Sequence, residues 1–211
     1  MEFVRFKGSA GGYFHDLHVG GLLQTAAGVV DANLLINSDL DFKRTYSGGV
    51  KSENLNLGKL LGDSKFGHAQ FNVDLEGFNY NDKYPESYIK GLVSSFDYSG
   101  YRYENISLDG IYKDGGFNGH LALDDENGKV RIDGSFNIAE KISDFNLYAT
   151  IQNLRLDKLN LSDKYIDSDI SFNLNADFTG SSIDDVNGRI LLDSLVLNAP
   201  QDKGYSLDNL T

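Results

Sequence analysis

The strictest pattern in this sequence is an alternation of apolar and polar residues between Phe145 and Phe178. Two runs show it, 145–151 and 170–178, and in both the apolar residues occupy every second position. Because successive side chains of a strand point to opposite faces, each run predicts a β-strand with one apolar face. Residues 153–159, between the runs, have the spacing of a short helical turn.

The string Asn-Leu-x-Leu-x-Lys-Leu occurs twice, at 54–60 and at 153–159. A second match follows each copy, Phe-Asn-Val-Asp at 71–74 and Phe-Asn-Leu-Asn at 172–175. We therefore predict two copies of one β-rich module, in which each string leads through a helical turn into an outgoing strand. The predicted parts are an N-terminal β segment, a first module and a truncated second module, all within one continuous structure: 1–49, 50–144 and 145–211.

The strongest hairpin signal is Asn127-Gly128, since both residues accept the positive φ of a type I′ turn. Closing the hairpin there places Glu126 opposite Lys129, which pairs their charges, and Leu123 opposite Ile132, which aligns apolar side chains. This hairpin and the other alternating runs predict an all-β fold. Its strands are repetitive antiparallel meanders, with a few single helical turns, that form an elongated open β-groove.

Two segments predict interruptions of the strands. The glycine-rich residues 8–12 predict a break after a first short strand, with a second strand over 13–19. Residues 79–87, which are polar and contain Pro85, predict a loop. We also expect the chain to be an interior piece of a longer protein, because strand-like patterns reach both of its ends.

Composition excludes several kinds of partner. The 211 residues carry a net charge of −12, so no basic stripe is available for nucleic acid or for an anionic membrane surface. The absence of cysteine rules out disulfides and thiolate chemistry. No apolar run reaches the roughly 18 residues that a membrane-spanning helix needs, and no signal peptide is visible.

No catalytic or metal-binding constellation stands out. His15 and His18 should point to opposite faces of a strand, which makes a metal pair unfavourable. Residues 124–128 lack the ligand spacing of an EF-hand and are explained by the hairpin, and residues 184–185 suit a turn. Neither a nucleophile elbow nor a nucleotide-binding fingerprint is present. We predict that the protein is not an enzyme and has no cofactor and no metal.

The apolar side of the strands must be covered by something. A second sheet would make a sandwich, closure would make a barrel, a membrane could cover the outside, or a ligand could lie in an open fold. One alternative is therefore an extracellular β-sandwich or solenoid that binds protein or glycan through its loops. Another is an outer-membrane barrel, although aromatic residues do not cluster at the strand ends.

The repeated segments resemble those of the AsmA/TamB superfamily, particularly TamB-like proteins of the Bacteroidetes. The likeness rests on Asn-Leu-Asn-Leu-Gly-Lys-Leu-Leu-Gly at 54–62, on Phe-Asn-Val-Asp-Leu-Glu-Gly at 71–77, on the hairpin over 117–136 and on 178–188. It covers the chain from about Val4 to Leu197. The resemblance implies a β-taco, a tall groove with an apolar lining. The membrane anchor and the C-terminal region of that superfamily have no counterpart in these residues.

The same resemblance implies a function in the cell envelope. The expected role is that of a periplasm-spanning bridge, anchored in the inner membrane, that moves phospholipid to the outer membrane or aids outer-membrane assembly. Its partners would be phospholipid acyl chains and, through the C-terminal region, an outer-membrane barrel, with no nucleic acid. We expect these residues to line the groove: Phe71, Val73, Leu75, Leu121, Leu123, Val130, Ile132, Phe145, Leu147, Ile151, Phe172, Leu174 and Phe178.

Overall fold

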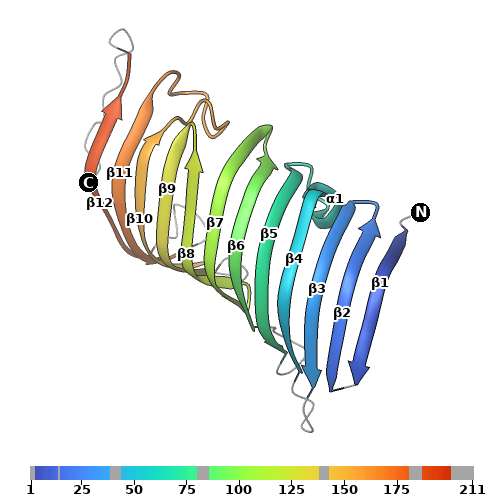
Figure 1. Cartoon of the computed structure of the whole chain (residues 1–211). Coiled ribbons are helices and arrows are strands. Elements are labelled where there is room, and N and C mark those ends of the chain that lie inside the picture. Colours follow the sequence, from blue (N-terminus) through green and yellow to red (C-terminus); the bar gives the residue numbers. More distant parts are fainter. Residues whose placement is uncertain are drawn as a thin grey trace.

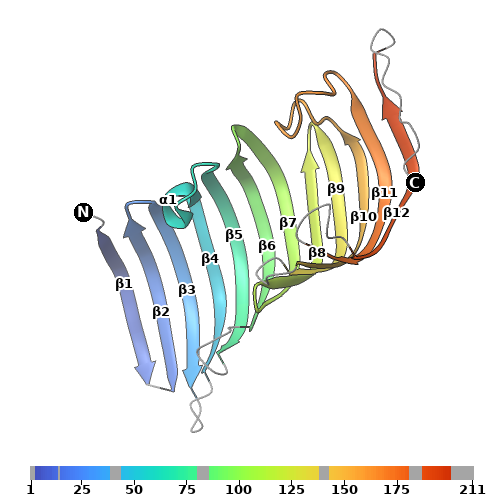
Figure 2. The same cartoon turned by 180° about the vertical axis from the view of Figure 1, so that it is seen from behind.

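A computed structural model of the chain describes residues 3–13, 15–38, 44–79, 86–137, 143–180 and 187–200. Its strands form a single antiparallel sheet of 12 strands in which each strand pairs with the next one along the chain (Figures 1 and 2). The predicted all-β meander is therefore confirmed. The elements are β1 (Val4–Tyr13), β2 (Asp16–Thr25), β3 (Gly28–Ser38), β4 (Arg44–Asn56), α1 (Leu57–Leu61), β5 (Phe66–Asn79), β6 (Glu86–Tyr98), β7 (Tyr101–Lys113), β8 (Gly116–Asp125), β9 (Gly128–Asn137), β10 (Asp144–Leu154), β11 (Asp169–Thr179) and β12 (Asn187–Asn198).

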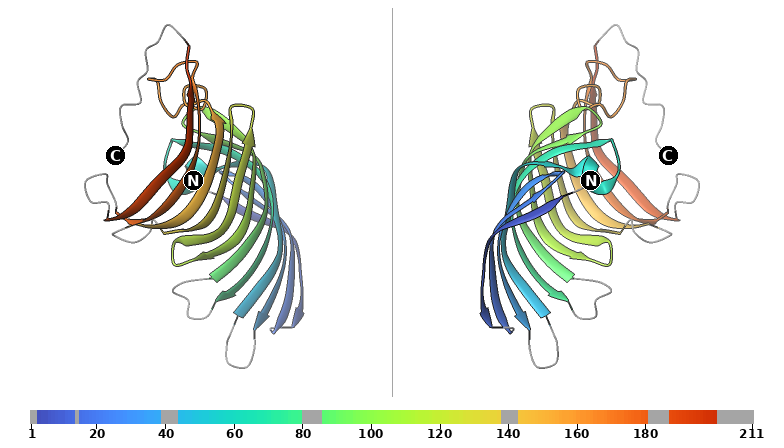
Figure 3. Two further views of the ribbon diagram at one scale, coloured as in Figure 1. Left: turned by 90° about the vertical axis from the view of Figure 1, so that its left-hand side faces the viewer. Right: turned by 90° about the vertical axis from the view of Figure 1, so that its right-hand side faces the viewer.

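The sheet is open, with β1 and β12 as its two edges. Seen along the sheet, the strands bend along their length, so that one face is concave (Figure 3). Helix α1 and the connection between β10 and β11 lie on the concave side, at one end of the strands (Figure 3). The proposed module boundaries, at 49/50 and 144/145, fall inside β4 and β10, and the sheet runs through both without a break.

Pairing across the strands decides which residues share a face, since directly opposed residues of antiparallel strands lie on the same side. Phe71 of β5 pairs with Val93, Val93 with Ile106, and Ile106 with Leu123 of β8. From β8 the row continues through Val130 to β10 and β11. We call this side of the sheet the apolar face and the other side the polar face.

Both copies of the repeated string leave a strand through a helical turn. In the first copy α1 begins at Leu57, and the Asn56 side chain accepts a hydrogen bond from the backbone N–H of Lys59, which caps the helix. In the second copy the N–H of Leu159 donates to the carbonyl of Arg155, one helical turn earlier. Strands β5 and β11 then lead away, as the repeat predicts.

The predicted break at residues 8–12 is wrong, because β1 runs through this glycine-rich segment to Tyr13. Gly8 lies opposite Gly21 of β2, and a Cβ on Gly8 would come within 2.2 Å of the Gly20 carbonyl oxygen. These glycines therefore allow two backbones to approach closely where the strands bend, rather than ending the strand. The strand predicted over 13–19 is wrong in its start, since β2 begins at Asp16.

The predicted register of the 117–136 hairpin is also wrong. Gly128 pairs with Asp125, so the two turn residues are 126 and 127, one position earlier than expected. Lys129 then lies opposite Asp124, with an ion pair of 2.8 Å, instead of opposite Glu126. The apolar side chains still align, because Leu123 now pairs with Val130 and the shift preserves the two-residue period.

Several predicted segments lie outside the described residues. Of the predicted loop at 79–87, residues 80–85 fall there, while residue 79 ends β5 and Ser87 belongs to β6. The carboxylates at 184–185 and the strand-like residues near the C-terminus also fall outside the described part.

Candidate functional site

All thirteen residues predicted to line a groove lie on the apolar face. The group on β5 joins the group on β8 and β9 through the paired residues of β6 and β7. The group on β10 and β11 joins through the pair of Val130 with Ile151, and Ile151 pairs in turn with Phe172. The structure thus brings together residues that are separated by about a hundred positions in the sequence, and their role in binding remains a prediction.

The apolar face extends beyond these thirteen residues across the whole sheet. Every described strand contributes to it, including strands for which no lining residue was predicted. The same two-residue alternation would have identified these additional positions: Val4, Phe6, Leu17, Val19, Leu34, Ile36, Val50, Ile89, Val93, Ile106, Leu108, Ile190 and Leu192.

Charge is confined to the ends of this face. Among the described strand residues only Arg44, at the start of β4, and Asp125, at the end of β8, bring a charged side chain to it. Asp125 is buried, and its carboxylate accepts hydrogen bonds from the Tyr101 hydroxyl and from the backbone N–H groups of Glu104 and Asn127. The long middle of the face therefore has no fixed charge.

The apolar face is largely uncovered. Of the thirteen predicted residues only Ile151 is buried, at 8% exposure, and the other residues are partly exposed. Among the described residues the one large side chain that is fully buried is Leu159, which lies outside the strands. In a β-sandwich a second sheet would cover such a face and bury its side chains. No such layer is present among the described residues, so the face is free to be covered by another molecule.

Aromatic rings gather toward both ends of the strands, so the expectation that aromatic residues do not cluster there is wrong. At the end where β7 turns into β8, Phe117 packs against Phe136, with ring centroids 5.8 Å apart. Phe145 stacks on Phe178 there, at 4.7 Å. At the opposite end the rings of Phe66, Phe96, Tyr98, Tyr101 and Tyr103 form a second cluster.

One end of the apolar face is covered by the two repeat copies, and we call it the covered rim. It consists of α1, none of whose residues is buried, and of residues 155–168, which contact the second aromatic cluster. The hydroxyl of Tyr103 donates a hydrogen bond of 2.9 Å to the carbonyl of Leu159. Beside it is an apolar hollow of about 120 Å³, between residues 154–170 and the end of β12. The apolar face is therefore covered in part at this end, chiefly by residues 155–168.

Two tyrosines of the second aromatic cluster, next to the covered rim, are partly removed from water. Burial raises the pKa of Tyr101 to about 12; the hydrogen bond from the Asn127 amide opposes this rise, and the Asp125 carboxylate adds to it. Burial likewise raises the pKa of Tyr103. Both phenols are therefore neutral hydrogen-bond donors at physiological pH, and they hold the rim together without adding charge to the apolar face.

Each repeat copy docks on the hairpin turn two strands before it. The N–H of Asn56 donates to the carbonyl of Ala27 at 2.7 Å, and the N–H of Arg155 donates to the carbonyl of Asn127 at 2.8 Å. In each turn the residue that accepts this bond also donates its own N–H to a side-chain oxygen two positions before it. Ala27 donates to the Thr25 hydroxyl, and Asn127 donates to the Asp125 carboxylate. The repeated unit therefore includes the preceding hairpin, which the string alone did not reveal.

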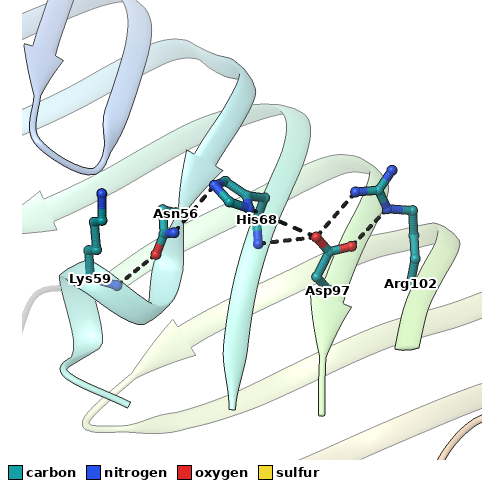
Figure 4. Close-up of polar contacts among 5 residues, drawn as sticks. All are labelled: Asn56, Lys59, His68, Asp97 and Arg102. Carbon is teal, nitrogen blue, oxygen red and sulfur yellow. Dashed lines mark hydrogen bonds and ion pairs between the residues drawn. The ribbon is translucent and has the colours of Figure 1, made fainter. Parts of the chain in front are cut away.

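The polar face carries hydrogen bonds and ion pairs from strand to strand. Near α1 they form a chain from the helix cap to β7 (Figure 4). The Asn56 amide lies 3.3 Å from His68 Nε2, and His68 Nδ1 lies 4.0 Å from an oxygen of Asp97. Arg102 donates two hydrogen bonds to the same carboxylate and, with the burial of Asp97 opposing it, lowers the pKa of Asp97.

Other charged residues also pair across neighbouring strands. Lys51 Nζ lies 3.3 Å from Asp31 Oδ2, and Lys90 Nζ lies 2.8 Å from Asp109 Oδ2. The members of each pair are directly opposite in the sheet, so the acidic residues are partly balanced locally. The polar face is thus a solvated surface, with no preference for an anionic or a cationic partner evident in these pairs.

The histidine prediction is corrected in part. His15 lies in the turn between β1 and β2, where its ring stacks on Tyr13 with centroids 5.6 Å apart, so the two histidines do not share a strand. His18 lies on β2, with its Nε2 atom 4.0 Å from Asp16 Oδ1. The described residues contain no group of three or more His, Cys, Asp or Glu side chains placed to hold a metal ion.

No described helix is long and apolar enough to cross a membrane. Comparison of the chain with known protein families, with curated proteins and with solved structures finds no match.

Proposed function

We propose that this chain is a non-enzymatic, TamB/AsmA-like segment that shields lipid acyl chains on its apolar face. The observation that carries the proposal is the continuity of that face over all 12 strands, without a charged side chain between the strand ends. A surface of this kind is expensive to leave in water, and lipid covers it without needing a specific polar site.

The dimensions of the sheet suit several acyl chains. Strands of 10 to 14 residues, at about 3.3 Å per residue, are roughly 33–46 Å long. One leaflet of a bilayer has a hydrocarbon depth of about 15 Å, half of the bilayer core. Eleven spacings of about 4.8 Å make the sheet roughly 53 Å wide. An acyl chain can therefore lie along a strand with its whole length on the apolar face.

The energy of burial is large enough to hold a lipid and does not fix its position. Sixteen methylenes moved from water to an apolar surface gain on the order of 13 kcal/mol, at about 0.8 kcal/mol each. Since every strand offers a similar surface, a lipid can move from one strand to the next without losing this gain. The superfamily resemblance adds the expected setting: the periplasm, an inner-membrane anchor and an outer-membrane barrel partner.

The alternative is a binding module for protein or glycan. Its strongest candidate loop, 79–87, lies mainly outside the described residues, and no side chain on the described part of the apolar face is suited to hydrogen-bond a sugar in the middle of the sheet. The uncharged and uncovered face favours acyl chains as the ligand.

The test compares two neighbouring positions on β11. Leu174 pairs with Ala149 and Leu192 on the apolar face, whereas Asn173 pairs with Thr150 and Asp193 on the polar face. The purified chain is mixed with phosphatidylcholine vesicles that contain a fluorescent acyl-chain phospholipid, and the lipid bound to protein is measured after the vesicles are removed.

We expect the wild type and Asn173→Asp to retain lipid and Leu174→Asp to lose most of it. The Leu174→Asp variant should still fold, because a carboxylate on an uncovered face can reach water. Binding of no lipid by the wild type would contradict the proposal. Equal binding by both variants would also contradict it.

A further inference from the structure

A row of aromatic side chains crosses the apolar face near the end opposite the covered rim. Strand pairing places its members side by side from β4 to β11, with Gly77 and Ser87 between the first two. We call it the outer aromatic row, and its members are Tyr46, Tyr112, Phe117, Phe136, Phe145 and Phe178. Aromatic side chains are typical of the level at which hydrocarbon meets polar head groups.

A cation lies just beyond this row. Tyr46 begins the row, and its hydroxyl reaches across Gly77 to form a hydrogen bond with the hydroxyl of Ser87. A Cβ on Gly77 would lie 2.2 Å from the Tyr46 ring, so only glycine leaves room for the ring there. Arg44 precedes Tyr46 by two residues and therefore shares its face; its side chain is exposed. The guanidinium is thus on the side of the row that faces away from the covered rim.

The covered rim has the opposite electrostatic character. Asp125, the charged strand residue at that end of the apolar face, is buried. The covering residues 155–168 contain three acidic and three basic side chains, so they add no net positive charge. Lys158 lies within ion-pair distance of two carboxylates of the same segment, Asp157 and Asp167. An anionic group is therefore favoured near Arg44 and disfavoured at the rim.

The distance between the outer aromatic row and the covered rim fits one layer of acyl chains. On β11 the eight residues from Phe178 to Ile170 span about 26 Å, at about 3.3 Å per residue. One leaflet of a bilayer has a hydrocarbon depth of about 15 Å, and two leaflets need about 30 Å. Lipids placed tail to tail along one strand would therefore not fit, so the head groups belong at one end.

We propose that phospholipids lie on the apolar face in a single orientation, with the phosphate at Arg44 and the acyl chains directed toward the covered rim. This inference rests on the proposed lipid binding and adds the class of head group and the direction of the lipid. A guanidinium offers paired N–H donors that match two phosphate oxygens. Arg44 is then a position of stronger binding on a face that holds lipid by hydrophobic contact elsewhere.

The first test asks whether the phosphate is bound. Wild type, Arg44→Gln and Arg131→Gln are mixed with phosphatidylcholine vesicles that contain either a fluorescent phosphatidylcholine or a fluorescent diacylglycerol with the same acyl chains. Arg44→Gln should retain roughly two- to fivefold less phosphatidylcholine than the wild type and as much diacylglycerol. Arg131→Gln removes a cation from the polar face and should match the wild type with both lipids.

The possible failures are distinguishable. Circular dichroism verifies that each variant is folded. If the wild type and Arg44→Gln retain phosphatidylcholine equally, lipid binding stands and the phosphate contact is overturned. A wild type that retains neither lipid overturns the proposed lipid binding itself, and the inference falls with it.

The second test asks for the orientation. The wild type is irradiated with phosphatidylcholine that carries a photoreactive group either on the head group or at the end of an acyl chain, and the labelled residues are located by mass spectrometry. The head-group probe should label residues near Tyr46, and the acyl-chain probe should label residues near Tyr103 and Leu159. Labelling of the same residues by both probes, or the reverse pattern, overturns the single orientation.

Discussion

The two repeat copies at the covered rim follow the same backbone path, but their side chains differ in burial. Each docks on the turn two strands earlier through one backbone hydrogen bond, and each forms a helical turn. Yet Leu60 of the first copy is 54% exposed, whereas Leu159, its counterpart, is fully buried. The repeated string therefore fixes the local path, and contacts with the rest of the sheet decide what that path covers.

The difference comes from the length of the connection that follows. Only residues 62–65 separate α1 from β5, whereas residues 160–168 precede β11. The longer segment has its own internal contacts, including a hydrogen bond from the N–H of Asp167 to the Asp157 carboxylate. It holds Leu159 against the aromatic cluster, where Tyr103 donates to the Leu159 carbonyl.

Replacement of Leu159 and of Leu60 by alanine should give the largest difference in stability between the two copies. Leu159→Ala removes a fully buried side chain and should destabilise the protein by about 2–5 kcal/mol. Leu60→Ala alters an exposed position and should change stability by less than about 0.5 kcal/mol. Urea unfolding of both variants measures the difference. Equal losses would show that the two copies pack alike and that this comparison is wrong.

Alanine substitution of a glycine should destabilise both of the turns on which the repeat copies dock. Gly28 and Gly128 have φ values of 141° and 152°, and a Cβ would lie 2.6 Å from the Asn54 carbonyl oxygen in one and 2.7 Å from Leu154 Cδ1 in the other. Alanine at either position should cost about 1–3 kcal/mol of stability. A loss in one copy without a loss in the other, by thermal unfolding, would break the equivalence of the two docking sites.

The helix cap is a smaller difference between the copies. Asn56→Ala removes the side chain that accepts from the Lys59 N–H and should cost about 1 kcal/mol. Arg155 occupies the corresponding position, and its hydrogen bonds to Asn127 and Leu159 come from the backbone, so Arg155→Ala should cost less. Hydrogen exchange at the amides of residues 57–62 tests the first variant. Unchanged protection there would exclude the cap as a stabilising contact.

The series of hydrogen bonds and ion pairs from Asn56 to Arg102, on the polar face beside the first copy, should make the smallest contribution to stability. This contribution should depend on pH. The pKa of Asp97 is lowered in the folded state, so its contribution is present above the unfolded pKa of about 3.9 and is lost as the pH falls through the folded value. Asp97→Asn should therefore be less stable than the wild type at pH 7, by less than about 1 kcal/mol. The difference should shrink on acidification. A difference that grows toward low pH would contradict this assignment.

The apolar face could be predicted from the sequence because its cause is local. A strand with one side against an apolar medium needs a two-residue period, and residues 145–151 and 170–178 show it without interruption. Pairing in chain order then places all the predicted residues on one side. The helical turn of the first copy was equally local, since its N-cap Asn56 lies within the string and its C-cap Gly62 follows two residues after it.

The errors had non-local causes. Gly8 looked like a strand breaker, but its role depends on Gly21 in the neighbouring strand. The turn register at 125–128 depends on Asp125, whose carboxylate also binds Tyr101 and the Glu104 N–H. Likewise, no local signal distinguishes buried Leu159 from exposed Leu60. Each of these features is decided by residues that meet only after the sheet has formed.

The most direct test of the central claim is photo-crosslinking at two adjacent positions of β9. Ile132 pairs with Leu121 and Ala149 on the apolar face, and Arg131 pairs with Ala122 and Thr150 on the polar face. A benzophenone side chain is placed at each position, the folded protein is incubated with phospholipid vesicles and irradiated, and adducts are identified by mass spectrometry. Lipid adducts at 132 and none at 131 are the predicted result. Adducts at both positions, or at neither, would contradict the assignment of the apolar face as a lipid track.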